Sequence, residues 1–224
     1  MRILLKPSDN HQYTSLYFSV KSTENPIIYG VKSVTNTIIL GVKSTDITYS
    51  HVYIRPTAHR DEMKRLAETT LLSWYNKTNR KPLLIDGARQ VGKTYLVEKL
   101  FGPKNFKKLI KLNFMKEPSL ADIFQSNLSP EFLLKNIQLV TGKEFNVKTD
   151  LLFFDEIGLC QEALNSLKFF NEERPDIAII ATGSNIGLLG SFPVGQVERY
   201  QLHPMGFEEF LCANGFSALA AEIN

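Results

Sequence analysis

The chain has 224 residues, of which 43% are hydrophobic, 22% charged and 11% aromatic, and its formal net charge is +3 at pH 7. This composition excludes a disordered chain, a collagen-like chain and a disulfide-rich scaffold. At about 150 residues per domain, the length predicts one sizeable domain with a small appendage. The weak basic charge does not by itself indicate binding to nucleic acid or to an acidic partner.

Cysteine usage and hydropathy predict a cytoplasmic protein. Cys160 and Cys212 lie far apart in the sequence and outside any metal-ligand spacing, which favours free thiols in a reducing compartment. Apolar runs such as Leu151–Phe154 are much shorter than the about 20 residues of a membrane span. Lys6 interrupts the first apolar residues before the core of a signal peptide could form. We therefore expect no membrane association.

An internal repeat distinguishes the first 57 residues. Val20–Gly30 has the sequence VKSTENPIIYG, Val31–Gly41 has VKSVTNTIILG, and a decayed third copy begins at Val42. Such repeats are typical of short β-rich units that stack on one another. Each unit contains only one small apolar cluster, and a small sheet without a covering layer is marginally stable. Residues 1–57 are therefore predicted to form either a small β-rich appendage or no stable fold.

Regular hydrophobic periodicity begins after Pro56. Apolar residues at helical spacing between Met63 and Trp74 predict an amphipathic helix of about five turns that ends at 76–80, with Arg65 among the charged residues that face solvent. Strand and helix patterns then alternate, with strands at 82–86, 108–114, 151–155, 177–182 and 199–202 and helices at 93–100, 119–125, 130–140, 163–171 and 207–213. Continuous apolar strands separated by helices predict an α/β fold whose parallel sheet is covered by helices on both faces.

A glycine-rich motif follows the first of these strands and opens the next helix. It consists of Gly87, Ala88, Arg89, Gln90, Val91, Gly92, Lys93 and Thr94, which fit the phosphate-binding pattern G-x-x-x-x-G-K-[ST]. The two glycines permit backbone angles and close approaches that a Cβ would block, and the amides at the helix start attract an anion. Lys93 is expected to reach the β- and γ-phosphates, and Thr94 to bind Mg²⁺. The motif predicts a P-loop.

Two carboxylates follow the buried strand at 151–155. Ligands of open α/β sheets bind beyond the carboxyl ends of the strands, which is where Asp155 and Glu156 are predicted to lie. Asp155 is expected to hold Mg²⁺ through its water shell, because this ion sheds water reluctantly. Glu156 is expected to polarise the attacking water as a general base.

The strand at 177–182 is expected to lie between the other two, and it ends in polar residues. Ser184 is the first candidate to hydrogen-bond the γ-phosphate or the attacking water, followed by Asn185 and Thr182. The alternative is an ordinary turn with capping hydroxyls.

Four blocks of sequence together resemble a known family. They are Lys81–Thr94 (KPLLIDGARQVGKT), Leu152–Ile157 (LFFDEI), Ala181–Ser184 (ATGS) and Leu202–Phe210 (LHPMGFEEF). Their order and spacing are similar to those of bacterial and archaeal AAA-type ATPases that carry a C-terminal domain of unknown function, which is often nuclease-like. The resemblance covers about residue 58 to the end of the sequence.

The resemblance implies roles for the residues that carry it. Residues 87–94 correspond to the Walker A loop, Asp155 and Glu156 to the Walker B pair, and Ser184 to the sensor-1 position. It also implies ATP and Mg²⁺ as ligands, and a homo-oligomer is a candidate assembly that the sequence does not decide. The preference for adenine rests on the resemblance alone, although the sequence has no guanine-reading N-K-x-D stretch.

Three features depart from the family pattern. Gln196 stands where members usually have a basic residue, and Arg199 is the candidate substitute for contact with a neighbour's nucleotide. The sequence stops soon after Glu208 and Glu209, so the helical lid and the C-terminal region are expected to be missing. The repeat-bearing segment has no recognised counterpart in the family. Together these features suggest a truncated ATPase.

Three functions are compatible with these observations. The first is an Mg²⁺-dependent ATPase. The second is a nucleotide-binding switch with negligible turnover that controls a protein partner, which the missing lid and Gln196 favour. The third is an ATPase linked to nucleic acid, for which the lysine-rich stretch Lys104–Lys111 is the candidate DNA-binding patch. Lysines that flank a strand are, however, more often a solvated face.

Overall fold

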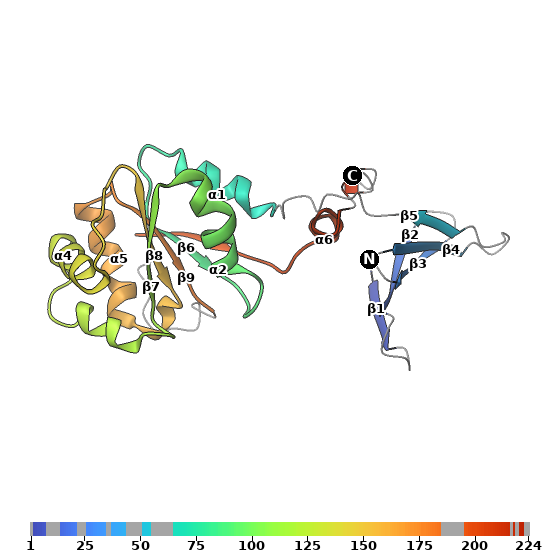
Figure 1. Cartoon of the computed structure of the whole chain (residues 1–224), viewed down its shortest axis with the longest axis horizontal. Helices are drawn as coiled ribbons and strands as arrows, with labels where there is room; N and C mark the ends of the chain where they lie inside the picture. Colours follow the sequence, from blue (N-terminus) through green and yellow to red (C-terminus); the bar gives the residue numbers. More distant parts are fainter. Residues whose placement is uncertain are drawn as a thin grey trace. The chain divides into compact units, whose positions relative to one another are not determined.

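The computed structural model describes residues 65–184, 195–215, 217, 220 and 221, together with the backbone of five strands within residues 2–54. The chain divides into two compact units (Figure 1). One contains residues 1–63 and 207–224, and the other contains residues 64–206. The boundary that the sequence predicts between residues 57 and 58 stays a prediction.

The first unit contains a five-stranded antiparallel sheet. Its strands pair in chain order: β1 (Arg2–Pro7), β2 (Thr14–Lys21), β3 (Pro26–Val34), β4 (Thr37–Lys43) and β5 (His51–Ile54). The repeat appears in the pairing of β3 with β4, where Gly30 lies opposite Gly41. Of the two alternatives predicted for this segment, the structure has the β-rich one. Helix α6 (Phe207–Ala213) belongs to the same unit.

The second unit is built on a five-stranded parallel sheet. Its strands are β6 (Leu83–Asp86), β7 (Lys108–Asn113), β8 (Asp150–Asp155), β9 (Ala178–Thr182) and β10 (Glu198–Gln201). The order across the sheet is β10-β6-β9-β8-β7, and all four neighbouring pairs are parallel. Because β9 lies between β6 and β8, the three strands that precede the predicted site residues are adjacent.

Helices connect the strands of this unit. The α-helices are α1 (Ala67–Tyr75), α2 (Lys93–Tyr95), α3 (Gly102–Asn105), α4 (Pro130–Thr141) and α5 (Gln161–Glu173). The helix after the glycine-rich loop continues from α2 as a π-helical segment, η1 (Leu96–Phe101), before α3. Two 3₁₀-helices, η2 (Pro118–Phe124) and η3 (Ile157–Leu159), follow β7 and β8. The sequence predicted helices over 93–100 and 119–125 but not their type.

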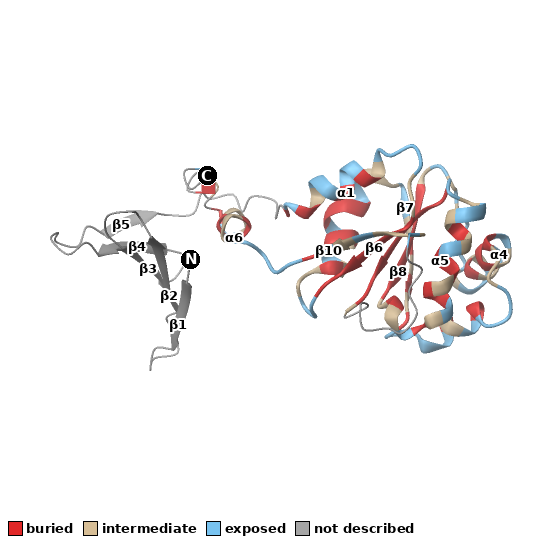
Figure 2. Ribbon diagram, turned by 180° about the vertical axis from the view of Figure 1, so that it is seen from behind, coloured by how far each residue is buried: buried red, intermediate tan, exposed pale blue. Residues whose placement is uncertain are grey.

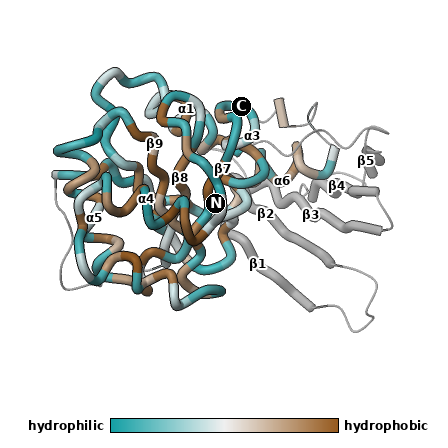
Figure 3. The backbone as a smooth tube through the Cα atoms, turned by 60° about the vertical axis from the view of Figure 1, so that its left-hand side comes forward, coloured by the Kyte–Doolittle hydropathy of each residue, from teal (hydrophilic) through white to brown (hydrophobic). Residues whose placement is uncertain are grey.

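Each face of the parallel sheet has its own hydrophobic core. Alternate strand residues such as Leu84, Leu152 and Phe154 pack under α4, α5 and η2. Their neighbours Ile85 and Phe153 pack under α1 and η1 on the other face. The central strands β6, β8 and β9 are buried along their lengths, whereas the edge strands β7 and β10 are only partly buried. The helices are exposed on their outer sides (Figure 2), and β8 and β9 are strongly hydrophobic (Figure 3). The predicted α/β architecture with helices on both faces is confirmed.

Within the described residues, none of the helices combines the length and the apolar character that crossing a lipid bilayer requires.

Candidate nucleotide-binding site

The predicted site residues lie at the carboxyl edge of the parallel sheet. The glycine-rich loop at 87–92 directly follows β6, and Thr182 at the end of β9 is in register with Ile85 of β6. Phe154 of β8 is in register with Ala181 of β9, so Asp155 ends β8 at the same level. This placement brings the loop, the acidic pair and the polar end of β9 to one edge.

Two glycines of the loop have the backbone angles and close approaches that were predicted for them. Gly87 has φ +150°, and a Cβ at this position would lie 2.3 Å from the carbonyl oxygen of Leu202. Gly92 has φ +95°, and its Cβ would lie 3.2 Å from a guanidinium nitrogen of Arg65. Backbone angles of this kind are readily adopted by glycine, so both positions need it. The Gly92 carbonyl accepts the first helical hydrogen bond, from Leu96 N at 2.8 Å.

Asp86 anchors the start of the loop. Its Oδ1 accepts a hydrogen bond from the Gly87 amide at 2.7 Å, and its Oδ2 pairs with the guanidinium of Arg199 on the neighbouring strand β10. The Asp86 carbonyl also accepts a hydrogen bond from Leu202 N at 2.7 Å. These contacts fix the direction in which the loop leaves β6.

The Lys93 side chain folds back over the loop. Its Nζ donates to the carbonyl oxygens of Gly87 and Ala88, both at 2.8 Å, and to Ser184 Oγ at 3.0 Å. Only 5% of Lys93 is exposed. Ser184 and Lys93 therefore face one another across the loop, and an anion held by the loop amides would meet both.

Burial lowers the pKa of the Lys93 ammonium. The nearby carboxylates of Glu156, Asp86 and Asp155 act in the opposite direction, but the effect of burial is larger. An ammonium that has lost hydration gains more from a new anionic partner than an exposed one does. The position thus favours binding of a phosphate.

Asp155 has partners on both carboxylate oxygens. Its Oδ1 accepts hydrogen bonds from Thr94 Oγ1 at 2.9 Å and from Thr182 Oγ1 at 2.6 Å. Its Oδ2 lies 2.7 Å from Asn113 Nδ2 and 2.8 Å from Lys111 Nζ. Burial would raise the Asp155 pKa, but the hydrogen bonds from Lys111, Thr182 and Thr94 outweigh it and lower the pKa. The carboxylate is therefore ionised at neutral pH although it is almost fully buried.

Thr94 and Asp155 form a donor set that fits Mg²⁺. Both offer hard oxygen atoms, which this ion prefers, and their direct contact at 2.9 Å places them within reach of one cation. Among the described residues no group of three or more His, Cys, Asp or Glu side chains could hold a metal by itself. This suits an ion that is held by few protein ligands and completes its shell with water and phosphate oxygens.

Glu156 has an unusual backbone conformation. It is the first residue after β8, and its φ of 55° and ψ of 44° lie in the left-handed region, which is uncommon for residues other than glycine. Gln90 in the loop also has a positive φ, of 65°. Strained residues of this kind are concentrated at functional sites. Glu156 thus joins the candidate site by both its position after β8 and its backbone conformation.

The comparison with protein families matches this region of the chain. The model of the AAA domain family matches residues 79–211, which is more than half of the sequence. The chain belongs to the AAA domain family. No curated protein matches the sequence.

Two solved structures are similar in fold to this AAA domain. PCH-2 from C. elegans shares 15% identity at a TM-score of 0.36, over 66% of this chain and 41% of that one. The genome packaging NTPase B204 from Sulfolobus turreted icosahedral virus 2, solved in complex with ATP-gammaS, shares 14% identity at a TM-score of 0.34, over 66% of this chain and 88% of that one. The match thus spans less than half the length of PCH-2.

The structure brings most of the predicted site residues of the AAA domain together. Lys93 and Ser184 are in direct contact, as are Thr94 and Asp155, and Glu156 directly follows Asp155. Thr182, the last of the candidates at the end of β9, donates its hydrogen bond to Asp155. Asn185 lies outside the described residues.

Two β7 residues that contact the acidic pair were not predicted as site residues. Lys111 and Asn113 both reach Oδ2 of Asp155. Both residues lie near the end of β7, which pairs with β8, and Asn113 is in register with Asp155. Their position at the end of a predicted strand was the signal that could have identified them. In the sequence Lys111 is one lysine of a basic run, and this obscured its contact with the site.

Arg65 also belongs to the site, and its predicted position was wrong. The sequence placed it on the solvent-facing side of the predicted amphipathic helix, but α1 begins at Ala67 and Arg65 is only 7% exposed. Its guanidinium donates to the carbonyl oxygens of Val91 at 3.0 Å and His203 at 2.9 Å. These two carbonyls, which are distant in sequence, draw the side chain inward, and Arg65 thereby supports the loop from behind.

Gln196, the position that departs from the pattern of the resembled family, lies far from the phosphate loop. The Gln196 side chain accepts a hydrogen bond from Asn171 Nδ2 at 2.6 Å and donates one to Glu172 Oε1 at 3.2 Å, both on α5. It precedes β10, whose first residue is in register with Leu83 at the start of β6, so it lies at the amino edge of the sheet. The phosphate loop follows the opposite end of β6. Gln196 is therefore remote from the site within this domain.

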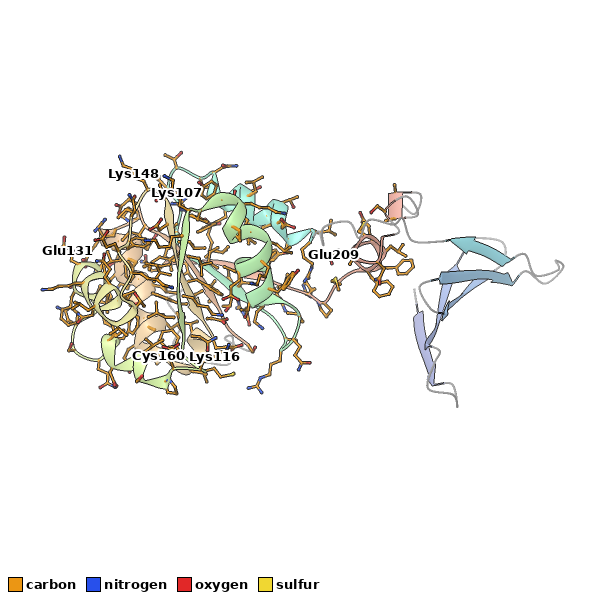
Figure 4. All side chains as sticks on the ribbon, in the orientation of Figure 1. Lys107, Lys116, Glu131, Lys148, Cys160 and Glu209 are labelled. Atoms are coloured by element: carbon orange, nitrogen blue, oxygen red, sulfur yellow. The ribbon has the colours of Figure 1, made fainter. Side chains whose placement is uncertain are left out.

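The lysine-rich stretch does not form a continuous cationic surface. Lys104 pairs with Glu68 at 3.1 Å, Lys108 donates to a main-chain carbonyl at 2.8 Å, and Lys111 pairs with Asp155. Lys107 is exposed and precedes β7, whereas Lys116 follows β7, so the two lysines lie at opposite ends of this strand (Figure 4). This arrangement supports the alternative of a solvated strand flank over a DNA-binding patch.

Proposed function

We propose that this AAA domain binds ATP together with Mg²⁺ and hydrolyses it. The observation that carries the proposal is the convergence at one sheet edge of three groups: the buried Lys93 ammonium over the loop, the paired Thr94 and Asp155 oxygens, and the strained Glu156. Each of them suits one part of phosphoryl transfer to water.

The roles of the residues follow from their contacts. The loop amides and Lys93 bind the β- and γ-phosphates, and Lys93 Nζ exchanges the Gly87 and Ala88 carbonyls for phosphate oxygens. Thr94 and Asp155 would hold Mg²⁺, which would neutralise charge that develops on the phosphates. Glu156 orients the attacking water and accepts its proton. The hydroxyl of Ser184, which already accepts a hydrogen bond from Lys93, donates a hydrogen bond to the γ-phosphate.

A nucleotide-binding switch is the second candidate. The observation that favours it is the placement of Gln196, which is uncharged and hydrogen-bonded to α5 where relatives are expected to have a basic group. AAA-type hydrolysis is commonly accelerated by a cation that stabilises the transition state. Without one, bound ATP would be released before it is cleaved.

A single-turnover experiment decides between the two functions. The full chain in excess is mixed with γ-labelled ATP and Mg²⁺, and the rate of phosphate formation is compared with the rate of ATP release measured by a chase with unlabelled ATP. We expect cleavage to be faster than release, so that most bound ATP appears as phosphate. Release at least tenfold faster than cleavage would favour the switch and contradict the proposed enzyme.

A further inference from the structure

Lys111 joins two acidic side chains beside the predicted metal site. Its Nζ lies 2.8 Å from Asp155 Oδ2 and 2.8 Å from Glu98 Oε1. The Asp155 side chain is 2% exposed, that of Lys111 21% and that of Glu98 30%, so the cluster is largely shielded from water. The ammonium also lies 5.4 Å from the centre of the Phe153 ring. This surrounding strengthens the electrostatic interactions among the three charges.

Three elements contribute one charge each. Glu98 is on η1, the continuation of the helix that begins with Lys93 and Thr94, whereas Lys111 is on β7 and Asp155 ends β8. The carboxylate geometry does not depend on Lys111 alone, because Asn113 also donates to Oδ2 and two threonine hydroxyls donate to Oδ1. The distinctive contribution of Lys111 and Glu98 is therefore charge.

Charge matters here because a dication must bind beside an ammonium. Asp155 paired with Lys111 alone would be a neutral pair and would attract Mg²⁺ weakly. The carboxylate of Glu98 offsets the charge of Lys111, so the cluster of three retains a net charge of minus one.

We propose that Glu98 is a positioning residue for Mg²⁺. Its negative charge offsets the positive charge of Lys111, so the Asp155 carboxylate can attract the cation. This inference rests on the proposed function, in which Asp155 holds the Mg²⁺ of bound ATP. It makes a prediction about sign that a purely structural role does not make. Removing the negative member must weaken Mg²⁺ binding, and removing the positive member must not.

The test is a cycle of Glu98→Gln, Lys111→Met and the double variant in the full chain. The probe is ATPγS, titrated with Mg²⁺ and again with a chelator, and the measured quantity is the factor by which Mg²⁺ tightens binding. We expect Glu98→Gln to reduce this factor about tenfold, as a charge change close to a dication should. Lys111→Met should keep or increase the factor, and the double variant should return to within about threefold of the wild type.

The cycle separates the possible outcomes. A factor that falls in both single variants, and furthest in the double variant, would show a structural role and overturn the inference, as would an unchanged factor in Glu98→Gln. Lys99→Met, an exposed lysine next to Glu98, is the matched control and should leave the factor unchanged. If Mg²⁺ does not tighten ATPγS binding to the wild type, the proposed function itself fails, whatever the variants do. Thermal unfolding of each variant verifies that it is folded.

Discussion

Replacing Lys93 by alanine is expected to weaken ATP binding about a hundredfold. The ammonium is buried over the loop, with two loop carbonyls and Ser184 as its partners, and we propose that phosphate oxygens replace the carbonyls in the complex. A charge-assisted contact of this kind contributes about 3 kcal/mol, which corresponds to about two orders of magnitude in affinity. Equilibrium titration of the variant with ATP in the presence of Mg²⁺ measures the change.

The matched control for this variant is Lys99→Ala. Lys99 lies on the same continuous helix but is exposed, so its removal alters the net charge equally without touching the loop. We expect its affinity for ATP to stay within about twofold of the wild type. Equal losses in the two variants would mean that Lys93 acts only through the overall charge of the protein, which would remove it from the binding site.

Glu156→Gln is expected to abolish most ATP cleavage while leaving ATP binding nearly unchanged. A positioned general base contributes about two to four orders of magnitude to a rate, and glutamine has the same shape but cannot accept the proton of the attacking water. Because the Thr94 and Asp155 oxygens remain in place, affinity for ATP with Mg²⁺ should change less than about threefold. Phosphate release under saturating ATP, together with binding titration, measures both quantities.

Glu173→Gln serves as the control for the loss of a carboxylate. Glu173 ends α5 and is exposed, so this variant should hydrolyse ATP at the wild-type rate. Equal rates in the wild type and Glu156→Gln would exclude Glu156 from the mechanism. Its left-handed backbone conformation would then need another explanation.

The sequence alone was sufficient to predict the parts of this fold that depend on local patterns. Apolar runs such as Leu151–Phe154 are buried on both sides, so they mark central strands of a covered parallel sheet regardless of the rest of the chain. The glycine-rich motif likewise constrains its own backbone, since Gly87 and Gly92 adopt the positive φ values that the loop needs. Asp155 and Glu156 could be placed because ligands gather beyond the carboxyl ends of parallel strands.

Residues that act through tertiary contacts could not be found in this way. Arg65 precedes α1 and has the composition of a solvent-facing position, yet carbonyls from the loop and from the region after β10 bind its guanidinium. Lys111 belongs to a lysine-rich run, and only the pairing of β7 with β8 shows that it reaches Asp155. Such contacts depend on strand order, which one sequence does not specify.

The type of helix could not be predicted from the sequence either. The segment Leu96–Phe101 has a periodic apolar pattern that predicts a helix, and it is π-helical in the structure. π-Helical turns are rare and are frequently found at functional sites. Glu98, the residue that we propose to balance the charge of Lys111, is in this segment.

The most direct test of the central claim is an equilibrium titration of the folded wild-type chain with ATP, with Mg²⁺ and again with a chelator. We expect saturable binding of one ATP per chain, tightened by Mg²⁺ because Thr94 and Asp155 are proposed to hold the cation beside the phosphates. GTP in a parallel titration reports the base preference. A folded protein that does not bind ATP at millimolar concentration would contradict the account.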